Sequence, residues 1–295
     1  MSDTNSATEL PLVFNCQGEQ CVGLLHCANS TTSTGVLILV GGPQYRVGSH
    51  RQFVLLARYL AAAGIPTMRF DVRGMGDSTG APRSFAEIDD DLHAAVEQFF
   101  LSCPNLRRLV LWGLCDAASA ALFYAYQDQR IQGLVLVNPW VFTEQGAAKT
   151  YLKHYYLRRL FNPDLWRKIF FLKFDYVASL NSLWDMFKRA LKPTKADINA
   201  KIDNNLALPV RMRESLKQFV YPVLLILSGR DLVADEFKET IVHDAQWQSL
   251  LDAQRLTRLD FPEADHTFST ASRRDQVAVW TLDWIKKSII KSQTN

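Results

Sequence analysis

The chain has 295 residues, of which 48% are hydrophobic and 21% are charged, and its formal net charge is +3. This composition is too apolar for a disordered chain, and the charge is too balanced for a nucleic-acid-binding tail. No run reaches the roughly 18 consecutive apolar residues of a membrane-spanning helix, and the start, MSDTNSATEL, lacks a basic and apolar signal segment. We therefore expect a cytoplasmic protein that has no nucleic-acid partner.

Short apolar runs alternate with helical patterns along most of the chain. The predicted strands cover residues 20–28, 35–40, 66–70, 107–112, 131–137, 222–228 and 255–261. The predicted helices cover residues 49–63, 84–102, 115–127 and 271–291. This alternation indicates an α/β fold with a mainly parallel, doubly wound sheet. We expect the first two of these strands to form an antiparallel hairpin at one edge.

The alternation stops between the segments VNPWV and YPVLLILS, where the chain becomes helical, aromatic and basic. Residues 149–173 contain seven Lys or Arg and one acidic residue. We expect a helical cap over residues 141–220, inserted into a core formed by residues 1–140 and 221–295. Three interpretations of these basic residues are open: they form a solvated helix face, they bind an anionic substrate, or they make peripheral contact with an acidic membrane.

The segment WGLCDAASA predicts a sharp turn from a strand into a helix, with Cys115 at its apex. Gly113 and Ala117 lie two residues before and two residues after Cys115, which matches the small-x-nucleophile-x-small pattern of a nucleophile elbow. A helix N-terminus favours a thiolate, whereas the neighbouring Asp116 disfavours one. Because a free cysteine is most often a small buried hydrophobe, this assignment depends on partner groups.

Those partners follow in the order acid and then base. Asp231 comes just after the predicted strand 222–228, and His266 comes just after the predicted strand 255–261. Parallel strands bring such loops to one edge of the sheet, so His266 is the expected base and Asp231 the expected acid. Asp235 remains an alternative to Asp231, since either carboxylate suits this loop.

Acyl chemistry also needs donors for an oxyanion. One is expected to be the backbone N–H of Asp116, directly after the nucleophile. The loop after residues 35–40 supplies the other, and Gly42 is preferred because Pro43 has no N–H. The alternative reading of this loop is a tight turn with no role in catalysis.

The cysteines are five in number and lack metal-site spacing: Cys16, Cys21, Cys27, Cys103 and Cys115. Without a secretion signal, reduced thiols are expected rather than a disulfide framework. The glycines near Cys115 and in RGMGDSTG match neither the dinucleotide fingerprint nor the phosphate-binding loop. We therefore expect neither a metal ion nor a cofactor.

Taken together, these motifs resemble the α/β-hydrolase superfamily over nearly the whole chain. The segment DVRGMGDSTG resembles a D-x-R-G-x-G-x-S stretch that supports the site in many members. VGGPQYRVGSHRQF, GLCDAASA, LSGRDLVADEF and ADHTFS are together similar to the hydrolases associated with exosortase A systems, here with a Cys-His-Asp triad. That resemblance implies a role linked to exopolysaccharide export.

The expected function is an acyl hydrolase that cleaves an ester or thioester through an acyl intermediate on Cys115. The substrate is expected to be a small molecule or a lipid-linked or sugar-linked acyl compound. An acyltransferase that uses the same intermediate is the first alternative, because a thioester also reacts with amines, thiols and alcohols. The second alternative is a catalytically weak binding or assembly protein with this fold.

Overall fold

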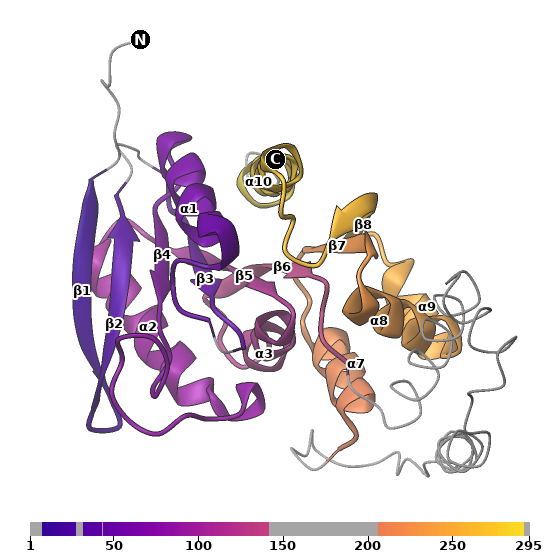
Figure 1. The fold of residues 1–295 in the computed structure, drawn as a ribbon, viewed down its shortest axis with the longest axis horizontal. Helices are drawn as coiled ribbons and strands as arrows, with labels where there is room; N and C mark the ends of the chain where they lie inside the picture. Colours follow the sequence, from indigo (N-terminus) through magenta and orange to yellow (C-terminus); the bar gives the residue numbers. More distant parts are fainter. Residues whose placement is uncertain (1–7, 28–31, 43, 142–205, 292–295) are drawn as a thin grey trace, which may run out of the picture.

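The computed structural model describes residues 8–27, 32–42, 44–141 and 206–291, and its sheet has the strand order β1-β2-β4-β3-β5-β6-β7-β8 (Figure 1). The strands are β1 (Glu9–Cys16), β2 (Glu19–His26), β3 (Thr34–Leu39), β4 (Thr67–Phe70), β5 (Arg108–Leu114), β6 (Ile131–Val137), β7 (Val223–Arg230) and β8 (Leu256–Asp265). β1 and β2 run antiparallel to their neighbours, whereas β3 to β8 are parallel. The predicted mainly parallel sheet is thus confirmed.

Helices cover both faces of this sheet. They are α1 (Gln52–Ala62), α2 (Asp89–Ser102), α3 (Asp116–Ala125), α7 (Leu208–Gln218), α8 (Leu232–Val242), α9 (Ala245–Leu251) and α10 (Ala271–Trp284). α1 and α10 share one apolar core with alternate strand residues, and the other helices share the second core (Figure 1). None of these described helices is long and apolar enough to cross a membrane.

Alternation along β3 shows how one short strand serves both cores. Leu37 and Leu39 belong to the core on the α2 and α3 side, whereas Val36 and Ile38 pack on the α1 and α10 side. All four side chains are almost completely buried. Because successive side chains point to opposite faces, a strand between two helical layers needs apolar residues at every position.

The predicted hairpin of residues 20–28 and 35–40 is wrong. β2 pairs instead with β1 and with β4, and β3 lies on the far side of β4. The turn between β1 and β2 is formed by Gln17 and Gly18, with φ values of 53° and 85°. Two central residues with positive φ match the twist of a tight hairpin, so this turn fixes the pairing of β2.

The predicted cap lies mostly outside the described residues, because residues 142–205 fall in one of the gaps. Within its predicted range, however, α7 is described and packs against α3. Met212 and Leu216 of α7 are buried in the core on the α2 and α3 side of the sheet. The cap therefore stays a prediction, and α7, which falls within its predicted range, packs against the sheet core.

Candidate active site

Cys115 lies at the turn from β5 into α3, with φ 63° and ψ −127°. This left-handed conformation is costly for a residue with a side chain and is characteristic of functional turns. The turn also depends on Gly113, because a Cβ there would lie 2.5 Å from the carbonyl oxygen of Ala117. The predicted elbow is therefore present, and its thiol is partly exposed.

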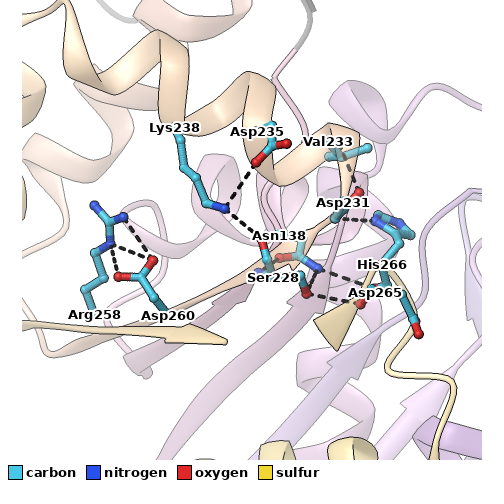
Figure 2. Close-up of polar contacts among 10 residues, drawn as sticks. All are labelled: Asn138, Ser228, Asp231, Val233, Asp235, Lys238, Arg258, Asp260, Asp265 and His266. Carbon is cyan, nitrogen blue, oxygen red and sulfur yellow. Dashed lines mark hydrogen bonds and ion pairs between the residues drawn. The ribbon is translucent and has the colours of Figure 1, made fainter. Parts of the chain in front are cut away.

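His266 follows β8 and contacts the acid that follows β7 (Figure 2). Its Nδ1 lies 2.7 Å from Oδ2 of Asp231, whose other carboxylate oxygen accepts a hydrogen bond from the Val233 N–H at 3.0 Å. Asp231 is thus oriented from both sides, by the first turn of α8 and by the imidazole. Asp235 instead forms an ion pair with Lys238 at 3.3 Å. Of the two candidate acids, Asp231 is the one that contacts His266.

The proton affinity of His266 is set by its two side-chain neighbours. Its hydrogen bonds with Asp231 and then with Cys115 raise the pKa of His266 to about 10, although burial acts in the opposite direction. At neutral pH the imidazole therefore holds its proton. The thiolate, rather than the thiol, is the nucleophilic form of cysteine. The arrangement suits attack on an electrophilic carbon followed by proton donation.

A buried asparagine ties the strand ends together beneath His266, and the sequence analysis did not identify it (Figure 2). Asn138 Nδ2 donates to Ser228 Oγ at 2.9 Å and to the His266 carbonyl oxygen at 3.3 Å. The Ser228 N–H donates to Asn138 Oδ1 at 2.8 Å, and Ser228 Oγ donates to the Asp265 carbonyl oxygen at 3.1 Å. The only available signal was an Asn-Pro pair at the end of an apolar strand.

The expected oxyanion donor Gly42 reaches the elbow, but its N–H is engaged. It donates to Oδ2 of Asp116 at 2.8 Å, while Oδ1 of the same carboxylate accepts from the Ala117 N–H at 3.0 Å. Burial raises the pKa of Asp116, although these N–H groups lower it in part. Residue type alone did not indicate that this side chain would lie against Gly42.

The DVRGMGDSTG segment holds the loop that carries Gly42. Asp71 accepts a hydrogen bond from the Arg46 N–H at 2.6 Å and also pairs with the Arg46 guanidinium. Arg46 in turn forms an ion pair with Asp77 at 2.7 Å. These contacts fix the chain a few residues after Gly42, so the segment positions the loop.

One described group of side chains has the spacing of a metal site, and it lies at the other end of the sheet. The ligand atoms of Cys16, Cys21 and Asp91 fall within 4.8 Å of one another. Arg73 occupies both carboxylate oxygens of Asp91, with hydrogen bonds of 3.0 and 2.8 Å. Burial raises the pKa of Cys21 to about 12, so its thiol keeps its proton. This chemistry suits a neutral, buried pair of thiols better than a metal centre.

A sequence model described as the alpha/beta hydrolase family matches residues 36–280. Among curated proteins, the chain is 31% identical over 108 residues to the acyltransferase drtE of Aspergillus calidoustus, covering 35% of each protein. It is 33% identical over 93 residues to the polyketide transferase grgF of Penicillium sp, covering 29% of this chain and 31% of that protein. A thiohydrolase, apmlB of Arthrinium phaeospermum, is 35% identical over 100 residues, covering 31% and 32%. The matches span about a third of these relatives.

Solved structures resemble the chain over almost its full length. The Pyrococcus furiosus esterase Pf2001 has a TM-score of 0.64 at 15% identity and covers 96% of this chain and 94% of its own. Est1E of Butyrivibrio proteoclasticus, solved with ferulic acid, has a TM-score of 0.60 at 15% identity and covers 95% and 99%. At this level of identity the likeness establishes a shared fold.

Proposed function

Because the chain belongs to the alpha/beta hydrolase family, we propose that it is an enzyme that hydrolyses an ester or thioester through an acyl group on Cys115. The observation that carries this proposal is the chain of contacts from Asp231 through His266 to Cys115. The thiol also occupies a strained turn at the carboxyl edge of the sheet, where α/β proteins place their ligands. A metal site is not needed for this chemistry.

In the proposed reaction, the sulfur of Cys115 attacks the carbonyl carbon and forms a new carbon–sulfur bond. The bond to the leaving group then breaks, and protonated His266 supplies the proton that the leaving group needs. His266 next takes a proton from water, which attacks the thioester and releases the acid. Asp231 keeps the imidazole oriented and stabilises its positive charge throughout.

Acyl transfer is the second candidate, and the relatives favour it. Two of the three are named as transferases and one as a thiohydrolase. An acyl thioester on cysteine is chemically open to both outcomes, because an amine, thiol or alcohol can replace water as the attacking group. Whether hydrolysis or transfer occurs then depends on whether water or another nucleophile attacks the acyl–enzyme first.

The physiological substrate class is proposed from the sequence motifs. Their resemblance to hydrolases associated with exosortase A systems supports an acyl compound linked to exopolysaccharide, carried on a small molecule, lipid or sugar. The seven basic residues within 149–173 support an anionic substrate or a contact with an acidic membrane surface.

Turnover of a butyryl thioester of N-acetylcysteamine tests this proposal, with butyrate and butyryl esters measured in the presence and absence of glycerol. We expect wild-type protein to release the thiol and Cys115→Ala to release none above background. Butyrate as the sole product indicates hydrolysis, and glycerol esters indicate transfer. If wild-type protein and Cys115→Ala are equally inactive with this donor and with p-nitrophenyl butyrate, a binding function replaces the proposal.

A further inference from the structure

The carboxylate of Asp116 occupies the place where an oxyanion is expected to bind. The two backbone donors of such a hole are the N–H of the residue after the nucleophile, here Asp116, and an N–H from the loop after β3. In this structure Gly42, in that loop, donates to Asp116 Oδ2 at 2.8 Å. The side chain of the residue after the nucleophile therefore takes up a donor that the reaction needs.

The surrounding backbone accommodates this carboxylate. Its second oxygen accepts from the Ala117 N–H at 3.0 Å. A Cβ at residue 41 would lie 1.9 Å from Oδ1 of Asp116, so only a glycine at this position leaves room for the carboxylate. Glycine at 41, the Gly42 N–H and the first turn of α3 together form a binding position for the Asp116 carboxylate.

Within the described part of the chain, no lysine or arginine forms an ion pair with Asp116. Its partners are backbone N–H groups, and the positive charge that acts on it comes from His266. A carboxylate held only by N–H groups can rotate toward a better donor, because each oxygen can accept more than one hydrogen bond. The contact with Gly42 is thus displaceable.

From this arrangement, and on the premise of the proposed acyl chemistry, we infer that Asp116 is a specificity-determining residue. While its carboxylate lies against Gly42, a carbonyl oxygen meets a negative charge in place of a donor, and the developing oxyanion is repelled. The acyl donors that react fastest carry a hydroxyl or amine close to the reactive carbonyl, for example on the β-carbon. Such a group gives the displaced carboxylate a hydrogen-bond donor and leaves the Gly42 N–H free for the oxyanion.

Three thioesters of N-acetylcysteamine with the same chain length test this inference: butyryl, β-hydroxybutyryl and β-aminobutyryl. The rate of Cys115 acylation is followed by thiol release and by intact mass. Wild-type protein should react at least about tenfold faster with one of the substituted donors than with butyryl, since a single oxyanion donor is worth about 10²- to 10³-fold in rate. Comparing the β-hydroxybutyryl and β-aminobutyryl rates shows whether a hydroxyl or an amine of the substrate donates to the Asp116 carboxylate.

Asp116→Ala removes the carboxylate that accepts from the Gly42 N–H. The rate of acylation by the butyryl thioester should therefore rise by about tenfold or more, and the preference for the substituted thioesters should shrink. Asp116→Asn keeps the shape but removes the charge, and it should show a smaller change in the same direction. Asp90→Asn is the matched control, because Asp90 is an exposed acid in the first turn of another helix, α2. Thermal unfolding of each variant confirms that the compared proteins are folded.

Equal wild-type rates for the three donors overturn the inference, as does an unchanged butyryl rate in folded Asp116→Ala and Asp116→Asn. In both cases Cys115 is still acylated, so the proposed function survives. If no donor acylates Cys115 in wild-type protein or in either variant, the proposed function itself fails, and the inference fails with it.

Discussion

The two ends of the sheet use the same kinds of side chain for different purposes. The candidate-site edge, formed by Cys115, Asp231 and His266, lies where β5, β7 and β8 end. The hairpin edge, built on β1, β2, β4 and α2, contains Cys16, Cys21, His26 and Asp91. Each end therefore has a thiol, an imidazole and a carboxylate.

The environments of the two histidines explain the difference. His26 is fully buried, and Arg69 donates to its Nε2 at 2.9 Å. Burial, followed by the charge of Arg69, lowers the pKa of His26 to about 4, whereas Asp231 and Cys115 raise that of His266 to about 10. The comparison teaches that access and charged neighbours decide which histidine suits acid–base chemistry, since residue type is the same at both ends.

The largest difference between the two ends of the sheet is expected when one cysteine at each end is replaced. Cys115→Ala should abolish thioester turnover, because the proposed acyl intermediate forms on the Cys115 sulfur. Cys21→Ala should keep activity within about twofold and lose about 1 kcal/mol of unfolding free energy, because the substitution leaves a small cavity. Steady-state turnover and urea unfolding measure both. Comparable loss of activity in the two variants would remove the distinction between the ends.

A second pair of variants distinguishes the roles of Asp231 and Asp235, which lie in the same segment. Asp231→Asn should lower the acylation rate by about 10³- to 10⁴-fold, because the amide no longer stabilises protonated His266. Asparagine can still accept from the Val233 N–H, so the start of α8 is preserved. Asp235→Asn, which affects the pair with Lys238, should change the rate by less than about threefold. The reverse ranking would assign the acid to Asp235.

One asparagine at each end of the sheet holds a loop by hydrogen bonds, and replacing each one tests whether that loop must be held for the reaction. Asn138→Ala should slow acylation by about 10- to 100-fold by letting the His266 loop shift, and buried partners left unpaired should cost about 1–3 kcal/mol of stability. Asn15, which accepts from the Gly18 N–H in the hairpin turn at 3.2 Å, is the matched control. Asn15→Ala should leave turnover unchanged. A purely structural role for Asn138 would lower the melting temperature without changing the rate measured in the cold.

The smallest expected effects are opposite pH responses of stability. The raised pKa of His266 gives a stabilisation that is complete below its unfolded value of about 6.5 and is lost as the pH rises toward about 10. The lowered pKa of His26 gives one that is present above about 6.5 and is lost as the pH falls toward about 4. Melting temperatures of wild-type protein, His266→Gln and His26→Gln across pH 4.5 to 9 measure both. Parallel trends for the two variants would contradict these assignments.

Local patterns were sufficient to predict which side chains lie together at the candidate-site edge. Gly113 and Ala117 around Cys115, and the loops carrying Asp231 and His266, are each encoded by a short segment next to an apolar strand. The pairing of β2 was not predictable in this way, because it depends on the turn at Gln17 and Gly18 that joins it to an overlooked strand. The contact of Asp116 with Gly42 was missed for a related reason: it joins residues 74 positions apart and depends on a side-chain rotamer.

The most direct test of the account is to locate the acyl group during turnover. Wild-type protein is mixed with the preferred thioester, quenched with acid within the first turnover, digested and analysed by peptide mass spectrometry. We expect the acyl mass on the peptide that contains Cys115, with none on Cys16, Cys21, Cys27 or Cys103. Turnover with the acyl group on another residue, or with no covalent intermediate under single-turnover conditions, would contradict it.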